Sequence, residues 1–273
     1  MSDRCRQVLL WGLAAVLLHS AAVAATFRPG AAVLPFHNTS MYSGHLLGRR
    51  AADQLALELG ATGVWRVVDR AQTDQALEQR GLRPPYAVGY LQEIGHALQA
   101  DVLFTGTVQR LEVDKKTGAI RMTVFVEAID QVSGQAVQAV TKTAEVRRND
   151  RTPEPTDVLI GRALAGVLAE VAVAAGKYTG IIGEVAEQGD GTTVKLKLPE
   201  NSGAETGFRF LLYRAGTEGE ERVPQKLLAS VMITKVSGTQ AEARVLARGG
   251  DIHSGDVAVS VCCEPKAGRN VGP

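Results

Sequence analysis

Residues 63–82 read GVWRVVDRAQTDQALEQRGL and contain the junction that best defines the fold. The apolar residues between Trp65 and Val68 predict a short strand, and residues 71–79 predict a helix that begins almost at once. Asp69 stands between the two, where a short carboxylate can accept hydrogen bonds from the free amides of a first helical turn. The Asp69–Arg70 pair therefore lies at a strand end, the place where α/β sheets carry binding sites.

The sequence on either side repeats this strand-then-helix order. A helix with leucine and alanine at four-residue spacing precedes the junction, and a meander of three long alternating strands follows it. The order β-α-β-α-α-β-β-β-α predicts an α/β domain built on a mixed sheet with helices. These elements are expected at residues 31–36, 43–59, 65–69, 71–79, 88–99, 101–113, 120–129, 135–146 and 156–175.

From residue 178 the pattern changes to short alternating strands separated by glycine-rich turns. Gly189-Asp190-Gly191 is a strong hairpin signal between two of them. About six strands up to residue 261 suggest a small all-β barrel or sandwich. We therefore expect an α/β domain at 26–176, a small β-barrel-like domain at 177–262 and a flexible tail at 263–273.

The first 25 residues have the pattern of a secretory signal peptide. A basic start, an apolar run at 8–18 and small residues after it predict cleavage after Ala24 or Ala25. The alternative is an uncleaved membrane anchor, but the apolar run is short for a membrane span. Cys5 precedes that run, in a place that does not suit a lipidated cysteine. Residues 1–25 are thus predicted to direct export and to be removed.

Cys262 and Cys263 would be the only cysteines of the processed chain. Adjacent cysteines close a strained ring that departs from favoured disulfide geometry. The simpler interpretation is the end of a last strand; a thiol switch or an intermolecular bridge is the alternative, because export permits disulfides.

The composition is that of a globular protein, and the sequence lacks recognisable catalytic motifs. The chain has 273 residues, 45% of them hydrophobic, and a formal net charge of +1, so no global field favours nucleic acid. Histidines and cysteines do not occur at metal-ligand spacing, and phosphate-binding and nucleophile motifs do not occur. We predict no enzymatic activity, no metal site and no cofactor.

Five polar residues at the predicted strand ends are candidate contacts for a partner or ligand. His37, Asn38 and Ser40 lie in the loop between the first strand and its helix, and Asp69 and Arg70 lie at the second such junction. Each also has a plain structural interpretation, because hydroxyl, amide and carboxylate side chains often cap helices. Arg70 would then form an ion pair or face solvent.

Three segments together resemble the curli-assembly channel (CsgG-type) family: VLPF at 33–36, VVDR at 67–70 and ADVLFTG at 100–106. Related domains occur in penicillin-binding-protein activator lipoproteins, in the N-terminal domain of the Tol-system propeller protein and in the middle domain of flagellar assembly protein T. The segment IHSGDV at 252–257 is similar to the C-terminal β-domain of that flagellar protein. The resemblance implies an anticodon-binding-like or Tol N-terminal-domain-like α/β fold.

The resemblance also implies a non-enzymatic assembly or adaptor protein in the periplasm of a Gram-negative bacterium, peripheral to the outer membrane at most. Its partners would be envelope proteins of a secretion, flagellar or cell-wall machinery, or further copies of the chain. A soluble adaptor is favoured over a pore, because residues 114–118 form only a tight turn where the channel inserts long hairpins. The alternative is a periplasmic small-ligand-binding or hydrolytic protein that uses a strand-end crevice near His37, Ser40 and Asp69.

Overall fold

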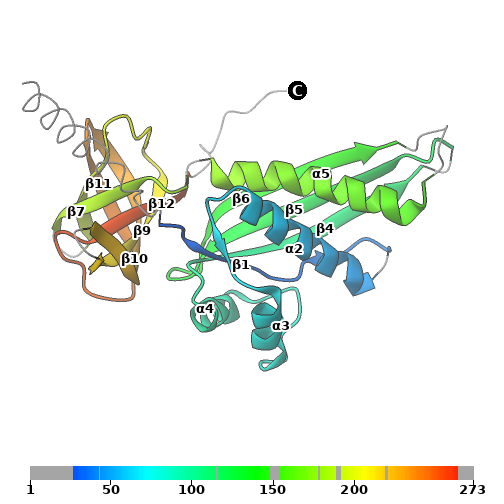
Figure 1. The fold of residues 1–273 in the computed structure, drawn as a ribbon, viewed down its shortest axis with the longest axis horizontal. Helices are drawn as coiled ribbons and strands as arrows, with labels where there is room; N and C mark the ends of the chain where they lie inside the picture. The colour runs from blue at the N-terminus through cyan, green and yellow to red at the C-terminus, as the bar shows by residue number, and fades with distance from the viewer. Residues whose placement is uncertain are drawn as a thin grey trace, which may run out of the picture.

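A computed structural model of the chain shows an α/β part followed by a β-barrel (Figure 1). The structure describes residues 27–42, 44–114, 116–147, 154–177, 179–188, 192–218 and 221–263. The predicted signal peptide and the predicted tail after Cys263 lie outside these residues, so cleavage after Ala24 or Ala25 stays a prediction. The predicted domain boundaries likewise stay predictions.

The α/β part confirms the predicted mixed sheet with helices. Its strands lie in the order β3-β1-β4-β5-β6, with the short β2 paired to β4. β1 runs parallel to β3 and β4, whereas β4, β5 and β6 form an antiparallel meander. The elements are β1 (Gly30–Val33), β2 (His37–Asn38), α2 (Gly44–Ala61), β3 (Arg66–Val67), α3 (Arg70–Glu78), α4 (Val88–Ala97), β4 (Val102–Val113), β5 (Ile120–Asp130), β6 (Ala136–Val146) and α5 (Thr156–Gly176).

Two predicted strands are shorter or more broken than expected. The strand predicted at 31–36 is split into β1 and β2, because the segment around Pro35 leaves the sheet and Phe36 turns inward. The strand predicted at 65–69 has only two residues, Arg66 and Val67. Trp65 instead packs edge-on against Phe104, with ring centroids 5.3 Å apart. Backbone pairing with β1 nevertheless extends past Val67, since the amide of Val68 donates to the carbonyl oxygen of Ala31 at 2.8 Å.

Helices α2 and α5 lie side by side over one face of the sheet (Figure 1). Each presents a continuous apolar stripe to the sheet, as the four-residue spacing predicts. The buried stripe of α2 contains Leu47, Ala51, Leu55 and Leu59, and that of α5 contains nine residues from Leu159 to Ala175. α3 and α4 cover the opposite face only around β1 and the beginning of β4. None of the helices in the described part of the chain lies on the remainder of that second face.

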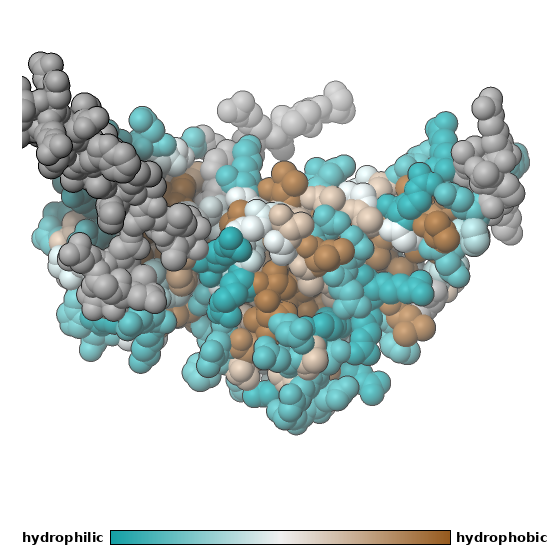
Figure 2. All heavy atoms as spheres, viewed as in Figure 1, coloured by the Kyte–Doolittle hydropathy of each residue, from teal (hydrophilic) through white to brown (hydrophobic). Residues whose placement is uncertain are grey.

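The outward side of the two long helices is partly apolar (Figure 2). Leu57 on α2 is 66% exposed and Val173 on α5 is 69% exposed. Among the described residues, α5 is the one helix long and apolar enough to cross a membrane, with a mean hydropathy of 1.9 over its best window. Half of that window is buried against the sheet and α2, as in the core helix of a folded domain.

The second part is a closed barrel, which decides between the two predicted all-β architectures. Its six strands close in the order β10-β11-β8-β7-β12-β9, and every pairing is antiparallel. Closure leaves the barrel without a free edge strand. The strands are β7 (Ile182–Gln188), β8 (Thr193–Lys197), β9 (Phe208–Glu218), β10 (Glu221–Ser237), β11 (Gln240–Arg248) and β12 (Val257–Cys263).

The barrel and the α/β part share one hydrophobic core. Leu211 and Tyr213 of β9 and Val257 and Val259 of β12 belong to the cluster that also contains the buried stripes of α2 and α5. The Thr179 hydroxyl, between α5 and β7, lies within hydrogen-bond distance of the carbonyl oxygens of Ala175 and Val261 at 2.9 and 3.1 Å. The shared core thus holds the two parts in one arrangement.

Candidate functional site

Asp69 is the N-cap of α3, as the sequence predicts. Its Oδ1 accepts a hydrogen bond from the backbone amide of Ala71 at 2.7 Å. Its carbonyl oxygen accepts from the amide of Thr73 at 3.1 Å and from the Thr73 hydroxyl at 3.2 Å. The carboxylate therefore satisfies a free amide of the first helical turn, and this contact orients it toward the helix.

Arg70 anchors α3 to the end of β1. Its Nη1 donates to the carbonyl oxygen of Val33 at 3.2 Å, and its Nε lies 3.1 Å from Asp53 Oδ1 and 3.3 Å from Asp74 Oδ1. Asp74 also forms an ion pair with Arg49. Two guanidinium groups and two carboxylates thus form a charge-balanced cluster that ties α2 and α3 to the sheet.

The Tyr86 hydroxyl lies beside this cluster and is shielded from solvent, with no hydrogen-bond partner among the described residues. Burial raises the pKa of Tyr86, and the nearby Arg70 opposes that rise. The hydroxyl consequently stays protonated at neutral pH. The strand end predicted as a site is thus occupied by structural contacts of Asp69 and Arg70.

His37, Asn38 and Ser40 form a second, separate group. The Asn38 side-chain amide donates to the carbonyl oxygens of Tyr42 and Gly44 at 2.8 and 2.6 Å, and its oxygen accepts from the amide and hydroxyl of Ser40. This local network holds the turn that leads into α2. His37 lies in β2, paired with Thr107 of β4.

The structure places the five predicted residues in two groups. Arg70 is held at the carbonyl of Val33, whose strand partner is Phe104, whereas His37 pairs three residues further along β4 at Thr107. Contact of these residues with a partner stays a prediction. A hydrolytic site would need nucleophile and base within hydrogen-bond reach, and the described contacts instead assign Asp69, Asn38 and Ser40 to caps and turns.

The uncovered half of the sheet offers a larger candidate surface, which we call the open sheet face. It consists of alternate residues of β5 and β6 that point away from α5, while their neighbours pack in the core. The Thr123 and Thr143 hydroxyls hydrogen-bond across the two strands at 2.9 Å, and Phe125 is partly exposed among them. The residues of this face are Arg121, Thr123, Phe125, Glu127, Ala139, Thr141, Thr143 and Glu145.

β6 is the last strand of the sheet, and its outer edge has no strand partner among the described residues. Its pairing with β5 is regular from Gln138 to Val146, a length of about 30 Å at about 3.4 Å per residue. Edge strands are usually protected by proline, bulges or exposed lysines. The central Lys142, whose side chain is 40% exposed, lies 3.1 Å from Glu170 of α5 on the helix side. The edge is thus long and regular, and none of the described strands pairs with it.

Sequence reasoning missed this surface, although part of its signal is visible. The alternation of polar and apolar residues at 120–129 and 135–146 correctly shows that each strand has one buried side. It does not show which strand ends the sheet, because strand order depends on pairing between distant segments. The open sheet face could therefore be recognised only after the sheet was assembled.

Comparison with known proteins shows similarity in fold to several solved structures. They include the PelC dodecamer from Paraburkholderia phytofirmans, at 19% identity and a TM-score of 0.36 over 52% of this chain and 87% of that chain. Lipoprotein GNA1162 from Neisseria meningitidis matches at 14% identity and a TM-score of 0.38, over 53% and 98% of the respective chains. LpoB from E. coli matches at 16% identity and 0.35, over 44% and 59%. No family model and no curated protein matches the sequence.

The predicted resemblance to the curli-assembly, Tol and flagellar-T families is therefore wrong. No model of these families matches, and the similar structures belong to other proteins. The physical reason lies in the residues that carried the resemblance. Asp69 is a helix cap, Val102–Phe104 is a buried central strand and Phe36 is a core residue. Such residues serve any α/β sheet of this kind and do not distinguish one family from another.

Proposed function

We propose that the chain is a non-enzymatic binding or adaptor protein of the cell envelope. The observation that carries the proposal is the edge of β6 beside the open sheet face. An unpaired edge offers backbone amides and carbonyls to an extended segment of another protein, which can add to the sheet as a further strand. The predicted signal peptide supports export, and the location proposed for the chain is the periplasm of a Gram-negative bacterium.

The chemistry of the open sheet face supports a protein partner. Threonine hydroxyls around Phe125 combine hydrogen-bonding groups with apolar area, and Arg121 and Glu145 pair with each other at the distal end at 2.9 Å. Side chains of an added strand would alternate between this face and the α5 side, where Lys142 and Glu170 lie. Backbone pairing would supply affinity, and these side chains would supply specificity.

Site-specific photo-cross-linking in cells tests the proposal. The full chain, with its own predicted signal peptide, carries a photoreactive phenylalanine analogue at Thr141 on the β6 edge or, as control, at Leu57 on the exposed side of α2. We expect cross-links to a defined set of envelope proteins from Thr141 and not from Leu57. Phe125→Asp should weaken those cross-links, because it places a charge within the contact surface.

Cell fractionation belongs to the same experiment, because the proposal requires export. Equal cross-linking from both positions, or none from Thr141, would contradict the β6 surface. Recovery of the chain in the cytoplasm at its unprocessed mass would contradict the envelope location.

A further inference from the structure

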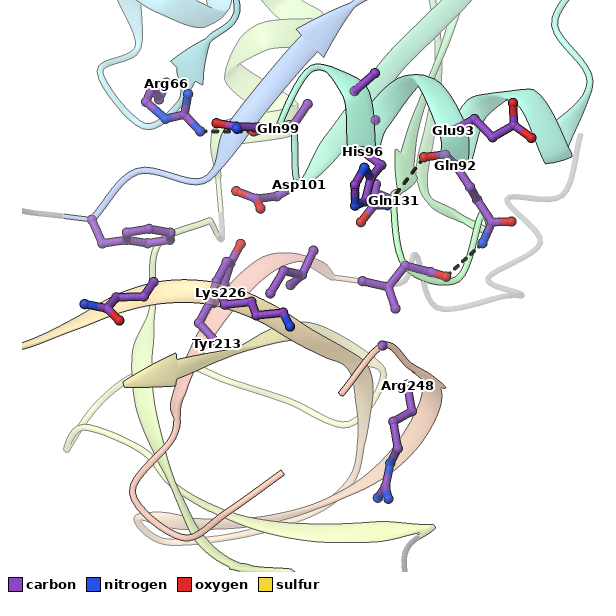
Figure 3. Close-up of a pocket in the computed structure, with 18 of the residues that line it drawn as sticks. Arg66, Gln92, Glu93, His96, Gln99, Asp101, Gln131, Tyr213, Lys226 and Arg248 are labelled. Carbon is purple, nitrogen blue, oxygen red and sulfur yellow. Dashed lines mark hydrogen bonds between the residues drawn. The ribbon is translucent and has the colours of Figure 1, made fainter. Parts of the chain in front are cut away.

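A crevice of about 1190 Å³ runs between the α/β part and the barrel, and we call it the domain crevice (Figure 3). One wall comes from α4, the segment that joins α4 to β4, and the turn between β5 and β6. The other wall comes from β9, β10 and the end of β11. Because the two parts share one core, the walls are held in place before any ligand arrives.

The inner end of the domain crevice is closed by two aromatic rings. Phe27 packs edge-on against Tyr213, with centroids 5.0 Å apart, and Tyr213 is only 2% exposed. The Tyr213 hydroxyl points toward the carboxyl group of Asp101 (Figure 3). Asp101 Oδ2 accepts from the amide of Gly30 at 2.6 Å. Burial raises the pKa of both side chains.

Cationic side chains outnumber acidic ones along the domain crevice. Four cations and two carboxylates line it, a net charge of +2, and they come from both parts of the chain: Arg66, Arg80, Lys226 and Arg248, with Glu93 and Asp101. The Arg248 side chain is directed away from Asp101 and Lys226 (Figure 3). Lys226 has no ion-pair or hydrogen-bond partner among the described residues. Arg66 donates to the carbonyl oxygen of Gln99 at 3.2 Å. The excess positive charge favours an anionic ligand.

The remaining polar groups suit a peptide. Gln92, Gln99, Gln131 and Gln225 line the domain crevice, and a side-chain amide both donates and accepts, as a peptide group does. A sugar ring is commonly held against an exposed aromatic face. Among the described lining residues, the phenyl and phenol rings are those of Phe27 and Tyr213, which pack on each other. An acidic peptide therefore fits this lining better than an acidic glycan.

We propose that the domain crevice binds an acidic peptide segment, with its carboxylates between Arg66 of the α/β part and Lys226 of the barrel. An arginine fork pairs with a carboxylate through two hydrogen bonds, and the lysine adds a point charge on the opposite wall. The side-chain amides of Gln99 and Gln225 hydrogen-bond the peptide backbone, because those of Gln92 and Gln131 already donate to the carbonyl oxygens of Val132 and Gln92. The proposal rests on the proposed binding function and deepens it, because it names the chemistry of one partner segment.

Fluorescence anisotropy with the processed full chain tests the proposal. The probe is a short fluorescein-labelled peptide of alternating glycine and glutamate, compared with the same peptide carrying glutamine. The glutamate peptide should bind more tightly and lose affinity as salt is added. Lys226→Gln and Arg66→Gln should each weaken binding about fivefold, the effect of losing one partly exposed ion pair. Lys235→Gln, on the same strand β10 but outside the crevice, is the matched control.

Any one of the following results would overturn the proposal that the domain crevice binds an acidic peptide. Tighter binding of an oligogalacturonate than of the glutamate peptide would assign the crevice to acidic glycans. Complete displacement by inorganic phosphate at equal concentration would indicate a simple anion site. An equal loss from Lys235→Gln, or no binding of the probe, would leave the crevice without a peptide role. Cross-linking from Thr141 in the Lys226→Gln chain separates this proposal from the proposed function. If the cross-links persist but wild type does not bind the peptide, only the crevice site is refuted. If wild type binds the peptide but Thr141 gives no cross-links, only the β6 surface is refuted.

Discussion

Replacing Gly48 by alanine should destabilise the α/β part, although alanine is the better helix former. Gly48 lies in α2, and the amide of Phe36 donates to its carbonyl oxygen at 3.1 Å. A Cβ at this position would lie 2.0 Å from the carbonyl oxygen of Phe36, whereas real contacts begin near 3.0 Å. The helix and the Phe36 backbone would therefore have to separate by about 1 Å.

Phe36 cannot move away freely. It is 1% exposed, and its ring lies so close to Gly106 that a Cβ there would be 2.9 Å from Phe36 Cε2. Forcing extra volume into a packed site costs about 1–3 kcal/mol, and because the close contact is with a backbone oxygen, the cost here lies in the upper part of that range, about 2–3 kcal/mol. The helix propensity of alanine returns at most about 1 kcal/mol. We expect Gly48→Ala to lower the free energy of unfolding by about 1–2 kcal/mol, which lowers Tm by about 4 °C in a domain of this size.

Gly161 and Gly166 on α5 are matched controls, because each is a helix glycine with open space where a Cβ would lie. Gly161→Ala or Gly166→Ala should raise the free energy of unfolding by about 0.5–1 kcal/mol. Urea unfolding followed by tryptophan fluorescence measures all three variants. The predicted cleavage removes Trp11, so the signal then comes from Trp65, which is 3% exposed in the α/β core. A Gly48→Ala chain as stable as wild type would refute the reasoning.

Three further predictions concern the same chain. Asp69→Ala should lower the free energy of unfolding by about 1 kcal/mol in urea titrations, because α3 loses its cap, whereas Asp69→Asn should keep most of it. Leu55→Ala should cost about 2–5 kcal/mol, since Leu55 is fully buried on α2, while Leu57→Ala on the exposed side should change stability by less than about 0.5 kcal/mol. Burial raises the pKa of Asp101 above 3.8, so its contribution to stability is present below that pH and is lost as pH rises through the raised pKa. Between pH 3.8 and the raised pKa, the free energy of unfolding of wild type should therefore fall relative to that of Asp101→Asn. A difference in unfolding free energy that stays constant at all pH values would contradict this prediction.

The sequence by itself determined the local features of the fold. Periodicity predicted the apolar stripes of α2 and α5, and Asp69 was placed as a cap because a carboxylate before a helix acts through its nearest amides. The change to short alternating strands after residue 178 likewise predicted an all-β part. These inferences succeeded because they depend on residues within a few positions of one another.

Only the tertiary structure decided where surfaces and crevices lie. The free edge of β6, the shared core around Tyr213 and the domain crevice between Arg66 and Lys226 all depend on segments far apart in the sequence. The structural contacts of Arg70 also depend on distant segments, because Val33 and Asp53 reach it only when α2 and α3 pack on the sheet. Long-range pairing and packing, which local sequence patterns do not encode, decide which polar residues are left available to a partner.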